Sequence, residues 1–186
     1  TEDTMVVTNY FYAAVCVNLD HRTDKWAECD AEFVKHSLDV HRWPAVDGND
    51  VNYKGPLKKG VIGCALSHLA AIEFARAREW ASILIFEDDV AFDDQLNDKF
   101  NEWIKEVPED WDMLYFGGNH NVKAITNKIS DHVFRATDTQ TTHAYAVRHT
   151  VYHRIIQRLR NIDKDVDVIY MDIQKECKAY CFTPRL

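Results

Sequence analysis

The segment 83–89, Ile-Leu-Ile-Phe-Glu-Asp-Asp, constrains the fold most, because an apolar run ends there in three consecutive acids. Its first four residues have the content of a strand buried on both faces, which is typical of parallel sheets. Side chains alternate along an extended chain, so Glu87 and Asp89 are expected on one side and Asp88 on the other. Converging carboxylates at a strand end suit Mg²⁺ or Mn²⁺, and open α/β sheets bind ligands at that edge. A solvated acidic turn before the next helix is the alternative interpretation.

Strand-like and helix-like segments alternate along the rest of the chain. The strand candidates are 13–19, 40–43, 83–86, 112–116, 132–136, 144–148 and 178–182. The helix candidates are 23–38, with Thr23 as its cap, 60–78, 96–104 and 150–159. Strands separated by helices predict one α/β domain over residues 1–186, with a mainly parallel sheet flanked by helices. Such a domain is also compatible with one module of a longer polypeptide.

The charge pattern narrows the classes of partner. The net charge is −8 and acids and bases are mixed along most of the chain, so general nucleic-acid binding through phosphate neutralisation is not expected. No segment approaches 18 uninterrupted apolar residues, and the opening Thr-Glu-Asp-Thr lacks a basic region followed by an apolar one. The sequence therefore predicts neither a membrane span nor a signal peptide.

The five cysteines bear on the cellular setting. Their odd number and their mostly apolar surroundings favour reduced thiols and a cytoplasmic protein. These residues are Cys16, Cys29, Cys64, Cys177 and Cys181. The last two can be assembled on paper into a zinc site with His149 and His153, although structural zinc sites usually show tighter paired spacings.

Several motif blocks occur in a fixed order along the chain. They are VCVNLDHR (15–22), WPAVDG (43–48), GCALSH (63–68), ILIFEDD (83–89), DMLYFGG (112–118), THAY (142–145) and VD (166–167). The set resembles glycosyltransferase family 25, which includes lipopolysaccharide-biosynthesis and collagen galactosyltransferases, and it extends from about residue 13 to 186. The resemblance implies a GT-A-type, Rossmann-like fold, a nucleoside diphosphate sugar donor, with a UDP-sugar as first choice, and a divalent metal.

By this resemblance, the acidic triplet takes the place of an Asp-x-Asp metal motif. Asp89 is the first choice as a ligand of Mn²⁺ or Mg²⁺ and Glu87 the second, while Asp88 is expected to face the ribose or the sugar. A metal there would neutralise the charge that grows on the departing diphosphate. The first position is Glu rather than Asp, so its carboxylate is one methylene further from the backbone.

The residues after the first strand are the expected nucleotide-binding residues. By the resemblance, Asn18, Leu19 and Asp20 lie where GT-A proteins bind the nucleotide, and Arg22 is expected to contact the base or a phosphate. The alternative interpretation treats Asp20 as a helix-start acid and Arg22 as a surface cation.

Other polar residues in apolar surroundings are candidates for the donor site and the chemistry. Ser67 and His68 interrupt an apolar helix; a donor-site role and an internally satisfied pair are both open. His143 is expected to reach the metal, the diphosphate or the acceptor. An inverting transfer needs a carboxylate to take the acceptor proton, and Asp167, in an apolar run that would raise its pKa, is the first candidate. Asp172 is the alternative, and both also fit a solvated acidic face.

Together these features predict a metal-dependent glycosyltransferase that moves a hexose, of galactose type first, to a glycan or other hydroxyl acceptor. Two other classes stay open. A metal-dependent hydrolase or nucleotidyltransferase also clusters acids beside a sheet. A nucleotide-sugar-binding domain without turnover would share the same donor residues.

Overall fold

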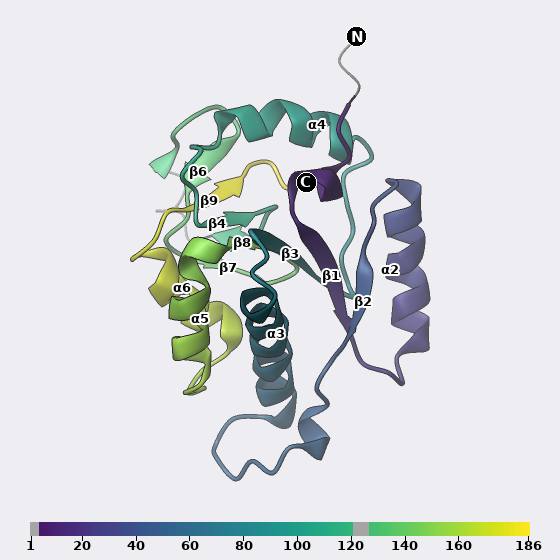
Figure 1. Ribbon diagram of the computed structural model, residues 1–186, viewed down its shortest axis with the longest axis vertical. Coiled ribbons are helices and arrows are strands. Elements are labelled where there is room, and N and C mark those ends of the chain that lie inside the picture. Colours follow the sequence, from purple (N-terminus) through teal and green to yellow (C-terminus); the bar gives the residue numbers. More distant parts are fainter. Residues whose placement is uncertain (1–3, 121–126) are drawn as a thin grey trace.

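The computed structural model describes residues 4–120 and 127–186 and contains a seven-stranded sheet with helices on both faces (Figure 1). The strand order is β2-β1-β3-β8-β4-β9-β6. The bounds of these strands are β1 Ala13–Asn18, β2 His41–Pro44, β3 Ser82–Glu87, β4 Met113–Tyr115, β6 Val133–Arg135, β8 Ala144–Arg148 and β9 Ala179–Phe182. A second sheet pairs the two-residue strands β5 (Asn119–His120) and β7 (Thr139–Gln140).

Five of the seven strands run in one direction. β1 is parallel to β2 and β3, and β4 is parallel to β9. β8 lies antiparallel between β3 and β4, and β6 is antiparallel to β9 at the edge. The α/β class and the mainly parallel sheet are thus confirmed, with the difference that β8 reverses direction in the middle of the sheet. This reversal puts the amino end of β8 beside the carboxyl end of β3.

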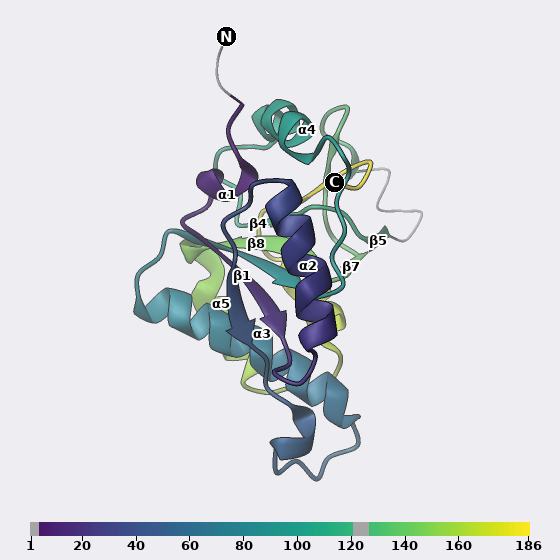
Figure 2. The same ribbon diagram turned by 90° about the vertical axis from the view of Figure 1, so that its right-hand side faces the viewer.

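Two helical layers cover the sheet (Figures 1 and 2). The helix bounds are α1 Val7–Tyr10, α2 Thr23–Lys35, α3 Lys59–Ala77, α4 Leu96–Trp103, α5 Tyr152–Leu159 and α6 Val166–Gln174; short 3₁₀ turns occupy Gly48–Asp50, Ile104–Glu106 and His149–Val151. α3, α5 and α6 pack on one face, and α1, α2 and α4 on the other. Side chains of β3 alternate between the two faces of the sheet. Ile83 and Ile85 pack in the core on the α3 side, and Leu84 and Phe86 pack in the core on the α2 side.

Two local expectations need correction. α2 begins at Thr23 as predicted, but Arg22 holds the N-cap position and no side chain caps the helix there. The chain from Val166 to Gln174 forms α6, which the sequence analysis did not predict. Its buried apolar residues, among them Val166, Ile169 and Ile173, recur at helical spacing and turn toward the core.

The central helix α3 bears on the prediction that the chain has no membrane-spanning segment. An 18-residue stretch of this 19-residue helix has a mean hydropathy of 1.2, and by length and composition alone the helix is apolar enough to cross a membrane. In the fold, its residues Ala65, Ala71, Ile72 and Ala75 are buried in the core cluster shared with α5 and α6. A helix that is apolar around most of its circumference is typical of such a buried position.

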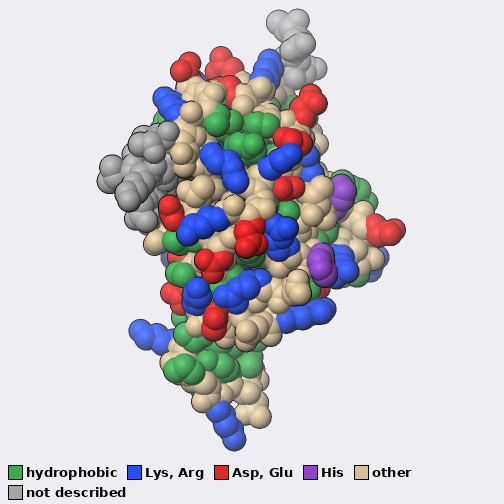
Figure 3. Space-filling view, turned by 90° about the vertical axis from the view of Figure 1, so that its left-hand side faces the viewer, with side chains coloured by type: hydrophobic (Ala, Val, Ile, Leu, Met, Phe, Trp, Pro, Cys, Tyr) green, Lys and Arg blue, Asp and Glu red, His purple; other side chains and the backbone are tan. Residues whose placement is uncertain are grey.

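Charged side chains of both signs are interleaved on the face that carries α5 and α6 (Figure 3). Some of them form surface ion pairs, such as Arg158 with Asp163 at 2.8 Å and Lys164 with Asp172 at 3.2 Å. Exposed pairs of this kind contribute little to stability, about 0–1 kcal/mol each. This face therefore carries a mixed charge pattern rather than a patch of one sign.

Candidate active site

The candidate site lies at one edge of the sheet, where β1 and β3 end and β8 begins. Glu87 is the last residue of β3, and Thr142 and His143 come directly before β8. The backbone N–H of Glu87 donates to the carbonyl of His143 at 2.9 Å, which fixes the two segments against each other. The antiparallel pairing of β3 with β8 thereby joins residues that are more than fifty positions apart in the sequence.

Three side chains form a group of potential metal ligands at this edge. One ligand atom each from Glu87, Asp89 and His143 lies within 4.8 Å of the others. His143 Nδ1 is 2.7 Å from Asp89 Oδ1 and 3.7 Å from Glu87 Oε1. The hydrogen bond with Asp89 raises the pKa of His143, because it stabilises the charged imidazolium. Asp89 and His143 are half exposed, so the group faces solvent and is accessible to a ligand.

Asp88 points away from this group. Its Oδ2 accepts a 2.7 Å hydrogen bond from the Nδ2 of Asn18 at the end of β1. The buried Asn18 amide has further partners: it donates to the Arg22 carbonyl and accepts from Arg42 Nε. Asp88 and Asp89 lie in the turn after β3, which the hydrogen bond from Val90 N–H to the Glu87 carbonyl closes, and the contact with Asn18 directs the Asp88 side chain toward the end of β1.

Glu87 is the most buried acid of the site. Burial pushes its pKa upward, but the nearby His68, Thr142 and His143 outweigh that effect and lower the pKa to about 2. Thr142 Oγ1 donates to Glu87 Oε1 at 2.8 Å, and His68 Nε2 lies 3.7 Å from Oε2. Glu87 is therefore a carboxylate at neutral pH despite its burial.

Three hollows meet at this edge; two lie beside the helices α3 and α6, and the third lies beside Gly117. The α3 hollow, of about 320 Å³, is lined by Leu19, Gly48, Gly63, Ser67, Glu87 and Asp88. The α6 hollow, of about 360 Å³, is lined by Gly60, Cys64, Glu87, His143, Asp165 and Asp167. The glycine hollow, of about 340 Å³, is lined by Asp89, Phe92, Phe116, Gly117, His143 and Arg185. Glu87 and His143 each border two of them, so the ligand group stands where the hollows meet.

The predicted donor-site residues divide into two sets. Leu19 and Ser67 line the α3 hollow, and Ser67 also supports its wall by accepting from the Val46 N–H at 2.8 Å. Asp20 accepts from Arg42 at 2.7 Å, and Arg22 pairs with Asp24 at 3.1 Å. Neither Asp20 nor Arg22 lines the α3 hollow, and in this structure each forms an ion pair near the surface; their predicted contacts with a nucleotide stay predictions.

The two candidate bases are separated by the fold. Asp167 lines the α6 hollow together with Glu87 and His143. Asp172 pairs with Lys164 and lines a different hollow, beside α5, that shares no residue with the α6 hollow. The fold therefore places Asp172 away from Asp167, because both acids lie on α6 and a five-residue step along a helix turns a side chain to another face.

The zinc assembly of Cys177, Cys181, His149 and His153 does not form among the residues that the structure describes. Two groups of potential metal ligands are found among the described residues. One is Glu87 with Asp89 and His143, and the other combines Cys64, His68 and Glu87. The sequence analysis quoted Cys64 only within a motif and gave it no role. The four-residue spacing of Cys64 and His68 was the available signal, since that spacing puts both side chains on one helix face.

Several residues of the site received no individual role from the sequence. Asp165 is a second carboxylate of the α6 hollow, and Arg185 lines the glycine hollow. Tyr145 and Tyr170 form a buried hydrogen-bonded chain that ends on His68 Nδ1, with 2.6 Å between His68 and Tyr145. These contacts depend on the antiparallel direction of β8 and on the helix α6. Neither was predicted from the alternation of apolar and polar residues in the sequence.

The fold and the edge group define an α/β protein whose candidate ligand site lies at the carboxyl ends of β1 and β3. Residues 12–170 match the family model of glycosyltransferase family 25 (LPS biosynthesis protein), and the chain belongs to this family. The family predicted by the motif blocks is thus confirmed.

Individual relatives extend this comparison. Procollagen lysyl hydroxylase and glycosyltransferase of Acanthamoeba polyphaga mimivirus is 26% identical over 89% of this chain and 22% of its own length. Procollagen galactosyltransferase 2 of Mus musculus is 28% identical over 54% of the chain and 20% of its own length. Inactive glycosyltransferase 25 family member 3 of Homo sapiens is 38% identical over 33% of the chain and 11% of its own length. The chain thus spans at most about a fifth of these curated relatives.

A solved structure supports the fold independently of sequence. The crystal structure of a glycosyltransferase involved in the glycosylation of the major capsid of PBCV-1 has a TM-score of 0.52 to this chain, with 8% identity. The match covers 91% of this chain and 80% of that one. At this identity the likeness concerns the fold, and it agrees with the Rossmann-like sheet expected for a glycosyltransferase.

Proposed function

We propose that this chain is a metal-dependent glycosyltransferase domain that moves a hexose from a nucleoside diphosphate sugar to a hydroxyl of a glycan or similar acceptor. One observation carries the proposal: Glu87, Asp89 and His143 converge at the sheet edge where three hollows meet. Membership of glycosyltransferase family 25 supports the reaction class. The relatives named procollagen galactosyltransferase favour galactose as the sugar to test first. UDP is the carrier proposed for it, from the resemblance of the motif blocks to the family.

The ligand chemistry fits Mn²⁺ or Mg²⁺. Glu87, Asp89 and His143 would hold the ion through carboxylate oxygens and one imidazole nitrogen, and imidazole favours Mn²⁺ of the two. When bound, the ion supplies positive charge for the diphosphate that leaves the sugar. Without an ion, the His143–Asp89 hydrogen bond raises the pKa of His143 and so favours the positively charged ring beside the two acids.

The α3 hollow is the proposed nucleotide site. It opens at the carboxyl end of β1, and its wall is close-packed: a β-carbon on Gly63 would meet Gly48 N and Val46 O at 2.7 Å. Asn18 holds Asp88 at the rim of this hollow through their 2.7 Å hydrogen bond. The proposed role of Asp88 is to accept hydrogen bonds from ribose or sugar hydroxyls, because its carboxylate points away from the proposed metal ligands.

The α6 hollow is the proposed place of proton transfer. Asp167 shares this hollow with Glu87 and His143, so it would accept the proton of the attacking hydroxyl if the reaction inverts the anomeric centre. Asp165 lines the same hollow and takes the place of Asp172 as the second candidate. The glycine hollow, on the other side of His143, offers space for the rest of the acceptor.

A donor-binding domain without turnover is the second candidate function. The observation that favours it is the 38% identity over 64 residues to a relative named as inactive. A hydrolase or nucleotidyltransferase has no comparable support. The cytoplasmic setting also stays a proposal, supported by the five cysteines, all of which are free thiols in the structure.

The test combines donor binding with product analysis. UDP-galactose, UDP-glucose and other nucleoside diphosphate sugars are titrated by calorimetry with and without Mn²⁺, and release of nucleoside diphosphate is followed with a panel of hydroxyl acceptors. We expect Mn²⁺-dependent binding of one donor, lost in Asp89→Ala but kept in Asp163→Ala, whose exposed acid lines the separate hollow beside α5. Binding without nucleoside diphosphate release would favour the domain without turnover, and no binding of any donor would contradict both.

A further inference from the structure

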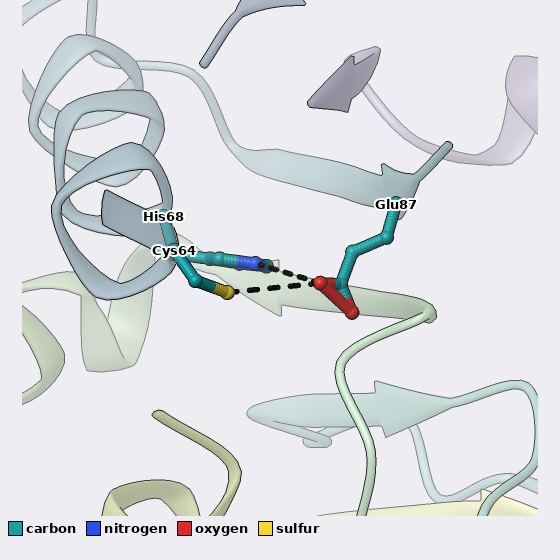
Figure 4. A group of neighbouring side chains, drawn as sticks. All are labelled: Cys64, His68 and Glu87. Atoms are coloured by element: carbon teal, nitrogen blue, oxygen red, sulfur yellow. Dashed lines mark hydrogen bonds and ion pairs between the residues drawn. The ribbon is translucent and has the colours of Figure 1, made fainter. Parts of the chain in front are cut away.

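A second ligand-like group occupies the other side of Glu87. Cys64 and His68 lie one turn apart on α3 and both side chains point at the Glu87 carboxylate from the helix side (Figure 4). Cys64 Sγ and His68 Nε2 are each 3.7 Å from Glu87 Oε2, and the three atoms lie within 4.8 Å of one another. This group combines sulfur, nitrogen and oxygen, whereas the Asp89 group holds two carboxylates and an imidazole.

Two of the three separations between these atoms are close to those of a tetrahedral zinc site. Zinc binds Cys sulfur at about 2.3 Å and His nitrogen or carboxylate oxygen at about 2.0–2.2 Å, so its ligand atoms lie about 3.4–3.6 Å apart. The two measured separations of 3.7 Å need only a small contraction to reach that range. At 3.7 Å, by contrast, the contact of His68 Nε2 with Glu87 is too long for a hydrogen bond.

His68 supplies the second, independent sign of a ligand. Its side chain is 0% exposed, yet Nε2 has no hydrogen-bond partner and is aimed at Glu87 and Cys64. A buried polar atom without a partner is costly and calls for an explanation. The other ring nitrogen, Nδ1, lies 2.6 Å from the Tyr145 hydroxyl, which in turn bonds Tyr170 at 2.8 Å. Metal-binding histidines are typically held by such a contact on the nitrogen that does not bind the metal.

We propose that Cys64 Sγ, His68 Nε2 and Glu87 Oε2 form a binding site for zinc or a similar thiophilic divalent cation. On binding, the Cys64 S–H bond breaks, a metal–sulfur bond forms and the proton leaves to solvent; no electron is transferred. The fourth position faces the α3 and α6 hollows, because Cys64 and Glu87 line both, and these hollows also provide the entry path. The site shares Glu87 with the proposed Mn²⁺ ligands but uses the other carboxylate oxygen, and its test measures binding of Zn²⁺ or Co²⁺ rather than sugar transfer.

The metal-free state has its own arrangement of the same groups. Burial, with Glu87 close by, raises the pKa of the Cys64 thiol, so the sulfur is protonated and donates to Glu87. A bound cation would replace this weak contact and give His68 Nε2 the partner it lacks. Glu87 Oε1 would keep its hydrogen bond from Thr142, which leaves this oxygen on the side of His143.

The test uses Co²⁺ and Zn²⁺ alone on the whole chain, kept reduced by a phosphine. We expect one equivalent of Co²⁺ to give a near-ultraviolet thiolate-to-cobalt charge-transfer band in the unchanged protein, and Zn²⁺ to bleach it. The band should disappear in Cys64→Ala, with zinc affinity from chelator competition at least about tenfold weaker. It should persist in the matched control Cys29→Ala and in Asp89→Ala. Absence of the band in the unchanged protein, or its survival in Cys64→Ala, would overturn the proposal.

A measurement without substitutions covers the case of a variant that does not fold. Alkylation of the unchanged protein, read by mass spectrometry at each cysteine, should show that Zn²⁺ slows modification of Cys64 at least about tenfold while Cys29 is unaffected. Equal rates at Cys64 with and without Zn²⁺ would contradict the site.

Discussion

The side-chain amide of Asn18, at the end of β1, donates a 2.7 Å hydrogen bond to Asp88 in the turn after β3. This contact links the carboxyl ends of two parallel neighbouring strands and keeps Asp88 away from Glu87 and Asp89. Asn18 is the only buried member of the predicted nucleotide-binding run 18–20, and its amide is fully used by Asp88, Arg22 and Arg42.

The change Asn18→Asp should destabilise the protein and disturb the site. It removes both amide donors and places a second carboxylate against Asp88, so we expect a loss of about 2–3 kcal/mol in the free energy of unfolding. Urea denaturation measures it. Asp20→Asn, two residues along on an 80% exposed side chain, is the control and should change stability by less than about 0.5 kcal/mol. Equal stability of both variants would show that the Asn18–Asp88 contact is unimportant.

Two glycines of α3 should respond to alanine in opposite ways. In Gly63→Ala the new β-carbon meets backbone atoms of Val46 and Gly48 at 2.7 Å, so the wall of the α3 hollow must shift at a cost of about 1–3 kcal/mol. In Gly60→Ala nothing lies within 4 Å, and a better helix former should stabilise by about 0.5–1 kcal/mol. Thermal unfolding of both variants decides this. Destabilisation by Gly60→Ala of the same size as by Gly63→Ala would contradict the packing described.

The pKa of His143 should depend on Asp89. The hydrogen bond that His143 donates to the Asp89 carboxylate raises the His143 pKa above its ordinary 6.5, so the imidazolium contributes stability that is complete below about pH 6.5 and is lost as pH rises through the raised value. Metal binding needs the neutral ring, so Mn²⁺ affinity should increase with pH over the same window. An NMR titration of the histidine ring protons, with His143→Gln to assign the signal, gives the pKa. Asp89→Asn should move it down toward 6.5; an unchanged pKa would remove Asp89 as the cause.

In the buried series His68–Tyr145–Tyr170, loss of the Tyr145 hydroxyl should reduce stability most, because this hydroxyl contacts both other residues. Tyr145→Phe leaves both His68 Nδ1 and the Tyr170 hydroxyl without this partner, so a loss of about 1–3 kcal/mol in stability is expected. Tyr170→Phe removes only the far end and is the matched control. If the zinc site exists, Tyr145→Phe should also weaken Zn²⁺ binding by about 10–100-fold. If the two variants changed the free energy of unfolding and the Zn²⁺ affinity equally, the Tyr145 hydroxyl would not be what holds His68.

Patterns that repeat locally were sufficient for much of the fold. The apolar run Ile83–Phe86 and the spacing of Leu96, Phe100 and Trp103 predicted β3 and α4 because burial enforces those periods. The direction of β8 was not predicted, since strand pairing is a long-range contact that leaves no local pattern. α6 was overlooked because its acidic residues and its short length resembled a solvated face.

The convergence of Glu87 and Asp89 was predicted from alternation along an extended chain. In the structure only Glu87 belongs to β3, whereas Asp88 and Asp89 lie in the turn that follows, and a hydrogen bond with Asn18 directs Asp88. His143 was a candidate without a known partner, and only the pairing of β3 with β8 shows that it meets Asp89. The separation of Asp172 from the edge group and the closeness of Cys64 to it were not predicted, because both depend on which side of a helix faces the sheet edge.

The antiparallel course of β8 also determines when the site can be completed during synthesis. The acids after β3 leave the ribosome before Thr142 and His143, and β4 and β9 pair on the far side of β8. A nascent chain that ends before β8 can pair β1, β2 and β3 and present the acidic triplet, yet it lacks the histidine and the threonine that bond to two of its members. Ligand capture through all of these groups therefore has to wait for β8, which ties the onset of binding to a nearly finished domain.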